Sequence, residues 1–346
     1  MRYLLITDTH GSLDIINSTA QAERADVVLH AGDFGFYDHG SPERLTDREL
    51  ALRITHSPLP ERERKRALLV APAALRVNPD LPPKTHAKTD TSVKGVKFGL
   101  DIETVLDVAK GVVGHPNLKV RGLHMHLGSP ILSVEPYRQG IARAETLIPA
   151  LRAQGHHIDI LNMGGGFGIN YRRSEAQPAQ AFADVIVPAV RKLGCSLVLE
   201  PGRFIAGNSG ILVSRVIYGK ESGGKKFVIQ DAAMNDLIRP TLYEAWHDIL
   251  PVRQPRPDAA KIRCDVVGPI CESGDYLAQN RDLPPLSAGD LIMVRSAGAY
   301  GAVMASTYNS RPLVPEVLVD GTRFAVVRPR PSIDEMLAVE RVPSWI

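Results

Sequence analysis

Cysteine and long apolar runs are both scarce in this sequence. Only three cysteines occur in 346 residues, Cys195, Cys264 and Cys271. Neither their odd number nor their spacing fits a disulfide framework or a metal site, so a reducing compartment, the cytoplasm, is expected. The first apolar stretch, Tyr3 to Ile6, is soon interrupted by Asp8, and no later run approaches membrane-spanning length. Secretion and membrane insertion are therefore not expected.

An excess of charge of one sign is lacking as well. The 41 basic and 38 acidic residues leave a formal charge of +3, and no lysine and arginine cluster is interleaved with the few aromatic residues. A nucleic-acid partner is therefore not expected, and a small-molecule substrate is favoured. A hydrophobic content of 44% is ordinary for a folded chain of one large or two smaller domains.

The first 66 residues read as a strand, a helix and a second strand. The runs YLLITD and DVVLHA enclose a helical stretch that starts at Ser12. From Ser41 to Arg66 the sequence is dense in charge and contains several prolines, which predicts a solvated helix or connector rather than core. We place a domain junction near Arg66.

Strands and helices alternate between residues 67 and 206. The expected strands are ALRV (74–77), VRGLHMHL (120–127), IDILNMGG and SLVLE, and the helix predicted over 101–113 has Asp101 as its N-cap. The apolar face of that helix is expected to hold Ile102, Val105, Leu106, Ala109 and Val113. Such alternation implies parallel strands, in a barrel or an open sheet.

After Gly207 the pattern changes to short strand candidates separated by glycine and proline. They are ILVSRVIY, KKFVIQD, RCDVVGP, DLIMVRSAGAY and PEVLVDG. Helical periodicity nearly vanishes there. Residues 207–346 are therefore predicted to form a separate β-rich domain.

Polar residues gather where the predicted strands end. GGGFG follows the strand IDILNM, so its backbone N–H groups can approach an anion, although a tight turn without a ligand is the alternative. In HMHLGS, strand alternation puts His124 and His126 on one side with Ser129 just beyond, although a lone strand histidine is more often a core residue. In EPGR, Glu200 and Arg203 are unfavourable at a strand end unless they bind something.

At this point the chain resembles the diaminopimelate decarboxylases. The resemblance covers residues 67–346 and rests on motifs that occur here in family order. These are LRVNPD, KFGL, HMHLGS, NMGGGFG, LEPGR, DAAMNDLIRPTLYEAWH, VVGPICESGDYLA and GAYGAVMASTYNSRP. The related ornithine and arginine decarboxylases share the glycine loop but not the forms GPICESGD or NDLIRPTLY.

The resemblance implies an alanine-racemase-like architecture that binds pyridoxal 5'-phosphate (PLP) at the carboxyl-terminal face of a TIM-type barrel. The predicted fold is accordingly α/β plus β. It consists of a partial TIM-type (β/α) barrel over 67–206 and a C-terminal β-domain over 207–346, preceded by a βαβ fragment over 1–66. The family also implies a homodimer with shared active sites.

Cofactor roles carry over by resemblance. His126 would stack on the pyridine ring, and Glu200 would pair with the protonated ring nitrogen, which keeps the ring able to accept the electrons left after CO₂ departs. The phosphate would be held by Ser129, the backbone around Gly165 and Gly166, and Tyr300. One departure is Pro130, which stands where the family usually has a polar residue.

Substrate roles carry over in the same way, for the conversion of meso-diaminopimelate to L-lysine and CO₂. Arg203, Arg239 and Tyr243 would grip the distal carboxylate. Cys271 and Glu272, which the partner subunit supplies in this family, would protonate the carbanion and recognise the distal ammonium. The alternatives are surface ion pairs for the arginines and a buried structural thiol for Cys271.

The lysine that bonds to PLP in this family has no counterpart in the sequence. It would lie at the end of the first barrel strand in a Tyr-Ala-x-Lys type motif, and ALRV resembles about the fifth strand of eight. Lys84, Lys88, Lys94 and Lys97 lie in the loop before KFGL, and Lys119 begins its strand. We therefore expect a family member with little or no decarboxylase activity, or a remnant that binds PLP without turnover.

The N-terminal fragment resembles a different family. ITDTHG and HAGDFGFYD look like the opening of calcineurin-like metallophosphoesterases, which implies a divalent-metal site through Asp8, His10 and Asp33. The family's later Asn-His and paired histidines are not found, so an inert site is the alternative. A metal-dependent phosphoesterase is therefore a second functional hypothesis. A natural fusion, a rearranged gene and an assembly error are all compatible with a join near Arg66.

Overall fold

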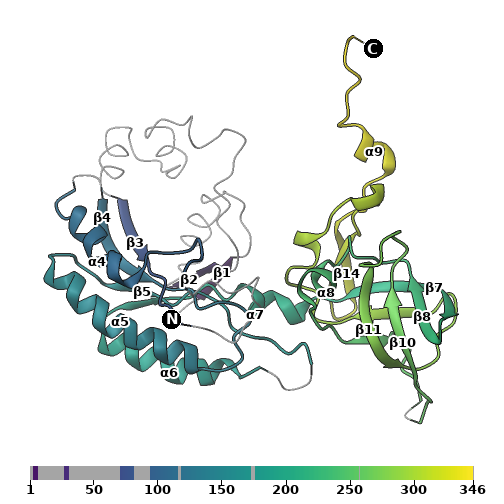
Figure 1. The fold of residues 1–346 in the computed structure, drawn as a ribbon, viewed down its shortest axis with the longest axis horizontal. Helices are drawn as coiled ribbons and strands as arrows, with labels where there is room; N and C mark the ends of the chain where they lie inside the picture. The colour runs from purple at the N-terminus through teal and green to yellow at the C-terminus, as the bar shows by residue number, and fades with distance from the viewer. Residues whose placement is uncertain are drawn as a thin grey trace. The chain divides into compact units, whose positions relative to one another are not determined.

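The computed structural model describes residues 3–6, 27–30, 71–81, 94–115, 118–172, 176–256 and 258–345 (Figure 1). The chain divides into two compact units. Unit 1 holds Met1–Ile169 and Ser174–Ile205, and unit 2 holds Asn170–Arg173 and Ala206–Ile346. The main division therefore falls beside residue 206, where the predicted β-domain begins. A junction at Arg66 stays a prediction, because that residue lies outside the described ranges.

Unit 1 is built on parallel strands. β3 (Ala71–Arg76), β4 (Leu118–His124), β5 (Ile160–Asn162) and β6 (Ser196–Val198) form one sheet in that order. β1 (Tyr3–Ile6) and β2 (Val27–His30) form a separate parallel pair. Within the described ranges these parallel strands agree with the (β/α)-barrel segment that the sequence predicts over 67–206.

Helices connect these strands, as the sequence alternation predicts. They are α4 (Ile102–Gly111), α5 (Glu135–Ala153), α6 (Ala179–Lys192) and the short α7 (Gly202–Ala206). α5 and α6 lie side by side against the sheet (Figure 1). Gly155 and Gly194 follow the ends of α5 and α6 with positive φ, which is the backbone conformation that glycine tolerates best at a helix end.

Two local predictions need correction. Val113 was assigned to the apolar face of α4, but the helix ends at Gly111 and the Val113 side chain is 49% exposed. Asp101 occupies the N-cap position without a side-chain cap hydrogen bond. The strand predicted over 120–127 is β4, which begins earlier, at Leu118, and ends at His124.

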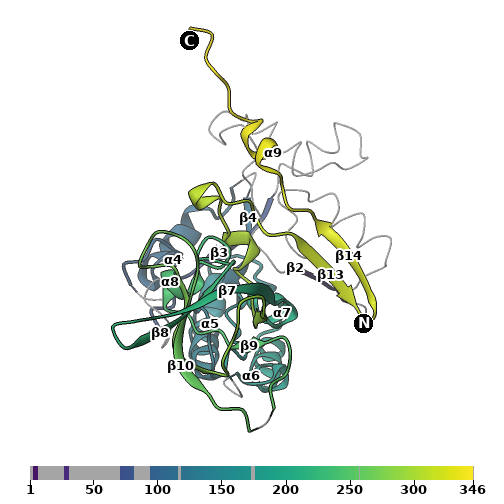
Figure 2. The same ribbon diagram turned by 90° about the vertical axis from the view of Figure 1, so that its right-hand side faces the viewer.

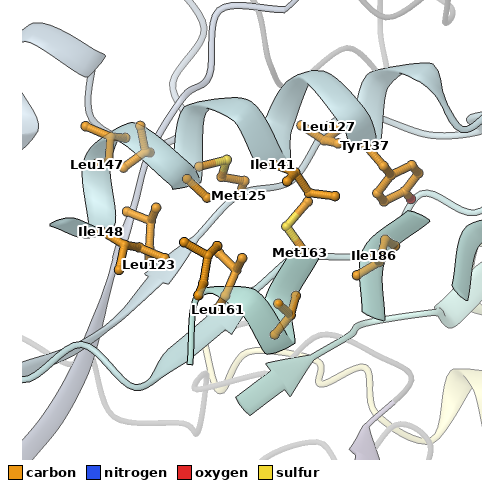
Figure 3. Packing of buried hydrophobic residues seen from close by; sticks show 14 of the residues in the cluster. Leu123, Met125, Leu127, Tyr137, Ile141, Leu147, Ile148, Leu161, Met163 and Ile186 are labelled. Atoms are coloured by element: carbon orange, nitrogen blue, oxygen red, sulfur yellow. The ribbon is translucent and has the colours of Figure 1, made fainter. Parts of the chain in front are cut away.

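The core of unit 1 lies between the sheet and α5 (Figure 3). Leu123 and Met125 are fully buried, and so are Leu161 and Met163 on the neighbouring segment. They pack toward apolar residues of α5, which include Ile148. Because side chains alternate along extended chain, burying Leu123 and Met125 turns His124 and His126 to the other side.

Unit 2 is β-rich. Its six-stranded sheet has the order β11-β10-β8-β7-β12-β9, and a separate hairpin follows it. The bounds are β7 (Leu212–Ser222), β8 (Lys225–Gln230), β9 (Ile249–Pro251), β10 (Ile262–Val267), β11 (Tyr276–Leu283), β12 (Leu291–Val294), β13 (Glu316–Asp320) and β14 (Arg323–Arg328). The five predicted strands are present, whereas β9, β11 and β14 are not predicted; β9 is short, and polar residues interrupt β11.

Helices are few in unit 2, as predicted. The α-helices that begin and end within it are α8 (Arg239–Tyr243) and α9 (Ile333–Leu337), and short 3-10 turns include η5 (Tyr308–Ser310). The β13–β14 hairpin leads into α9 (Figure 2). None of the helices in the described ranges is long and apolar enough to cross a membrane.

Candidate functional site

Glu200 follows the carboxyl end of β6, and polar residues at the ends of β5 and β4 lie beside its carboxylate. The Asn162 side-chain amide, at the end of β5, donates to the Glu200 carboxylate at 2.8 Å. His124 Nε2, at the end of β4, lies 3.4 Å from the same carboxylate oxygen. Three adjacent parallel strands therefore direct one acid, one amide and one imidazole to a single point.

His124 is kept neutral by its surroundings. Burial lowers the pKa of its imidazole most; Glu200 raises that pKa, and Arg76 lowers it again. Its Nε2 atom is buried and makes no hydrogen bond to any described residue. A buried polar nitrogen without a hydrogen bond, beside a half-exposed carboxylate, is a feature that a polar ligand would complete.

The glycine loop after β5 is fixed through its carbonyl groups. Gly164 O accepts from Glu200 N at 2.9 Å, and Gly166 O accepts from Ile131 N at 2.7 Å. Gly165 O accepts from the Tyr137 hydroxyl at 2.6 Å. Burial raises the pKa of that hydroxyl, so it remains a donor. Because these three carbonyl groups accept hydrogen bonds from other segments of the protein, they hold the loop in one conformation beside Glu200.

His126 contacts the glycine loop directly. The Gly165 backbone N–H donates to His126 Nδ1 at 3.3 Å. Since Nδ1 accepts, a neutral His126 ring carries its proton on Nε2. The structure thus brings His126, Gly165 and Glu200 together.

Ser129 and Arg203 form a second contact in unit 1. Arg203, on α7, is only 7% exposed, and its Nε donates to Ser129 Oγ at 3.1 Å. A buried guanidinium beside a hydroxyl provides donors for an anionic group. Gly166 lies beside this segment, since a Cβ on Gly166 would overlap the Gly128 carbonyl oxygen.

The lysines of unit 1 do not complete this site within the described ranges. Lys119 lies at the amino end of β4, and Lys94 and Lys97 precede Leu100. Lys84 and Lys88 lie outside the described residues. No described lysine of unit 1 directly follows the carboxyl end of a parallel strand.

In unit 2, Arg239 at the start of α8 is buried in an aromatic setting. Its guanidinium lies 2.7 Å from His247 Nε2 and 4.5 Å from the centre of the Tyr171 ring. His247 Nδ1 lies 2.9 Å from the Arg295 carbonyl oxygen, to which it donates. Since Arg239 donates to Nε2, His247 is the neutral Nδ1–H tautomer and acts as an acceptor for the arginine. Tyr243 ends the same helix.

Cys271 and Glu272 lie on an exposed turn after β10, beside η5. The Tyr308 hydroxyl donates to Glu272 Oε2 at 2.9 Å, and the Asn309 amide donates to Cys271 Sγ at 3.6 Å. Thr241 Oγ1 of α8 donates to the Gly274 carbonyl at 2.6 Å, which ties the same turn to α8. The exposed thiol corrects the alternative of a buried structural cysteine.

Two buried carboxylates anchor the segments around this turn. Asp275 accepts from the backbone N–H groups of Met234 and Ile270, both at 2.7 Å. Asp236 accepts from Ala233 N at 2.9 Å and lies 3.5 Å from the Arg311 guanidinium. Burial is the largest influence on both and raises the pKa of each carboxyl group.

The raised pKa of Asp236 has a measurable consequence for stability. A raised folded-state pKa means that the folded protein binds the proton more tightly than the unfolded chain. This stabilisation is present below the ordinary Asp pKa and is lost as pH rises through the raised value. We expect the free energy of unfolding of the wild type, relative to Asp236→Asn, to fall in urea titrations as pH rises above the ordinary Asp pKa of about 4. A relative stability that rises with pH would contradict this.

The remaining predicted site residues are placed as follows. Tyr300, in unit 2, is 40% exposed with a left-handed backbone, φ 57°. Asp8, His10 and Asp33 lie outside the described residues, and the described ranges contain no group of metal-ligating side chains. The phosphoesterase hypothesis stays a prediction.

Sequence reasoning assigned no role to Asn162, His247, Tyr308 or Asn309. All four stand within or beside motifs that carried the resemblance: NMGGGFG, NDLIRPTLYEAWH and MASTYNSRP. Those motifs mark the segments, but the partners of Tyr308 and Asn309 are 36 and 38 residues away in the chain. Such contacts have no local signal in one sequence.

Comparison with known proteins supports the family resemblance that the sequence motifs indicate. Residues 33–298 match the family model "Pyridoxal-dependent decarboxylase, C-terminal sheet domain". Diaminopimelate decarboxylase of Zymomonas mobilis is 43% identical over 278 residues, which is 80% of this chain and 65% of that protein. The enzyme of Pseudomonas aeruginosa is 46% identical over 78% of this chain and 64% of that protein. The chain thus spans less than two thirds of the length of these curated relatives.

Solved structures resemble the chain over nearly its whole length. A diaminopimelate decarboxylase from Helicobacter pylori, complexed with L-lysine, has a TM-score of 0.80 at 29% identity and covers 98% of this chain and 90% of its own. The enzyme from M. jannaschii has a TM-score of 0.77 at 28% identity, covering 99% of this chain and 80% of its own.

Proposed function

Because this chain belongs to the pyridoxal-dependent decarboxylase family, we propose that it binds PLP and meso-diaminopimelate at the site described above. The reaction of the intact enzyme would convert meso-diaminopimelate to L-lysine and CO₂. Since the sequence contains no Tyr-Ala-x-Lys type motif, we expect this chain to retain binding groups of that reaction rather than its full catalytic apparatus.

The residues of unit 1 suit the cofactor end of the site. PLP, when bound, supplies an electron-accepting ring and an anionic phosphate. Glu200, held by Asn162, would keep a proton on the ring nitrogen, and His126 would lie on the ring face. Ser129 and the glycine loop would bind the phosphate. This set of donors and acceptors among the described residues of unit 1 fits non-covalent binding of PLP.

By the family resemblance, Arg203, Arg239 and Tyr243 would bind the distal carboxylate, and Glu272 of the partner subunit would bind the distal ammonium. Planar guanidinium groups match carboxylates in geometry, and both arginines are at most 7% exposed, so their interactions are little screened by water. Cys271 would deliver a proton from Sγ to the substrate carbon. The L-lysine complex of the Helicobacter pylori relative supports a diamino acid as ligand.

The observation that carries this proposal is the Glu200 carboxylate, which accepts a hydrogen bond from Asn162 and lies beside His124 Nε2 at three strand ends. Equilibrium dialysis with PLP tests it. We expect saturable binding, weakened about tenfold or more in Glu200→Gln, because one charge-assisted contact to the ring nitrogen is lost. Glu145→Gln, which removes a surface ion pair with Lys192, is the matched control. Absent PLP binding, or equal binding by Glu200→Gln, would refute the proposal.

Asn162 offers a further prediction. Asn162→Asp keeps the shape of the side chain but replaces the amide that donates to Glu200 by a second carboxylate. We expect PLP affinity to fall about tenfold, because two like charges at hydrogen-bond distance displace Glu200. Gln180→Glu is the control, since the Gln180 amide donates to Asp184 on the surface of α6 at 2.6 Å. PLP titration of both variants measures the difference, and equal affinities would count against the role of Asn162.

A homodimer in the cytoplasm is part of the same proposal. The β13–β14 hairpin exposes an apolar surface consisting of Val317, Leu318, Val319, Phe324 and Val326, each 49% to 76% exposed. Exposed apolar surface of this kind is typical of an interface. The three free thiols are consistent with a reducing compartment. Light scattering after size-exclusion chromatography should give the mass of two chains, and a monomer at all concentrations would refute the dimer.

A further inference from the structure

Cys271 and Glu272 are neighbours in the sequence, and each of them contacts one member of a second pair of sequence neighbours, Tyr308 and Asn309. The Tyr308 hydroxyl donates to Glu272 Oε2 at 2.9 Å, and the Asn309 amide donates to Cys271 Sγ at 3.6 Å. Neighbours on one turn thus meet neighbours on another, across more than 35 residues of chain. A donor aimed at sulfur favours the thiolate that remains when the thiol gives up its proton.

The backbone of η5 is shaped for this arrangement. Asn309 has φ 54° and ψ 32°, in the left-handed region, and Ser310 has φ 55°. Asparagine is one of the few residues other than glycine that adopt this conformation readily. Asparagine therefore suits the backbone conformation at position 309, from which its side chain reaches Cys271 Sγ.

Both turns are anchored to one segment, residues 231–236. Asp275 fixes the Cys271 turn by accepting from Met234 N and Ile270 N. Arg311, one residue beyond η5, donates to Asn235 Oδ1 at 3.0 Å and to the Asp231 carbonyl at 2.5 Å. Ser306 N also donates to the Asn235 carbonyl at 2.9 Å. A shared anchor sets the distance between the two turns, so the two contacts are not free surface pairings.

A cavity of about 680 Å³ lies against this arrangement. It is lined by Met234, Asn235, Ile238 and residues 306–310, which include Tyr308 and Asn309. The side chains that hold Cys271 and Glu272 therefore also line a space that a small molecule fits.

We propose that Tyr308 and Asn309 are positioning residues, Tyr308 orienting the Glu272 carboxylate and Asn309 holding the Cys271 sulfur through its donated N–H. The functional meaning of this arrangement rests on the proposed function, in which Cys271 delivers a proton and Glu272 recognises an ammonium. The geometric claim itself needs neither cofactor nor substrate.

The reactivity of the Cys271 thiol tests the proposal without any decarboxylase activity. Iodoacetamide alkylation of the full chain is followed by peptide mass analysis from about pH 6 to pH 9. Cys195, a partly buried thiol of unit 1, is the internal standard. Among the described titratable groups, Tyr308 lies close enough to Cys271 to feel its charge, and the pKa of Tyr308 is raised mainly by its hydrogen bond to Glu272.

Two variants keep the left-handed backbone of η5. Asn309→Gly removes the donor, and we expect the Cys271 alkylation rate near neutral pH to fall about fivefold, as for the loss of one hydrogen bond. Asn309→Asp places a carboxylate in the same volume, and a fall of more than about tenfold is expected. In both variants the midpoint of the rate–pH curve should move to higher pH, while the Cys195 rate stays constant.

The pH profile separates positioning from simple shielding. A change in access to the thiol alters the rate equally at every pH and leaves the midpoint in place. An unchanged midpoint in both variants would therefore overturn the proposal, whatever the absolute rates. A chain that fails to bind PLP but shows the shifted midpoint would refute the proposed function and leave the positioning role intact.

Discussion

Carbon dioxide release from meso-diaminopimelate by this chain, loaded with PLP, is expected to remain near background. The family's lysine tethers the cofactor and displaces the product amine, and no described lysine of unit 1 directly follows a parallel strand end. Replacing a tethered group by a free one forfeits an effective molarity that reaches on the order of 10⁵ M, or roughly 7 kcal/mol. Binding without turnover is the expected result.

Borohydride reduction of the PLP-loaded chain, followed by peptide mapping, checks whether any lysine forms a covalent bond with PLP. No single lysine should be pyridoxylated in stoichiometric amount. A full-length relative treated in parallel is the positive control for both assays. Robust CO₂ release together with one dominant modified lysine, for example Lys84 or Lys88, would show that another residue has been recruited, and the prediction would be wrong.

Gly165→Ala is expected to destabilise unit 1 and abolish PLP binding. A Cβ on Gly165 would overlap the Glu200 carbonyl oxygen and lie 2.9 Å from its carbon. Both are backbone atoms, so the strand ends must separate, which costs about 1–3 kcal/mol or more. The same movement displaces Glu200 from Asn162, so PLP affinity should fall at least about a hundredfold. Urea unfolding and PLP titration measure the two effects.

Gly202→Ala is the matched control. Nothing lies within 4 Å of a Cβ placed on Gly202, which begins α7 next to Arg203. Its effect on the free energy of unfolding should be within about 0.5 kcal/mol, and PLP affinity should be unchanged. If Gly165→Ala behaves like Gly202→Ala, the close approach of the glycine loop to Glu200 does not constrain the site.

The sequence was most informative where local rules apply. Alternation of apolar and polar residues located β4 and predicted that His124 and His126 share a side, because an extended chain has a period of two. Glycines with positive φ marked the ends of α5 and α6. The strict order of the decarboxylase motifs identified the family and the segments of the site, although not the contacts within it.

Elements with weak local signals were missed. β11 reads YLAQNRDL, in which polar residues interrupt the alternation, because its pairing with β10 rather than its own pattern makes it a strand. Val113 continues the helical pattern of α4 in sequence, but the helix ends two residues earlier. Propensity and periodicity describe a segment in isolation, and tertiary pairing decides its limits.

The sequence by itself determined the family, the alternating barrel segments, the β-rich C-terminal unit and the absence of a lysine in the expected motif. Only the tertiary structure decided which groups meet: Asn162 and His124 at Glu200, His247 at Arg239, and Tyr308 and Asn309 at Glu272 and Cys271. The reason is physical. Hydrogen bonds between distant segments depend on strand order and loop paths, and these are set by burial over the whole unit rather than by any local pattern.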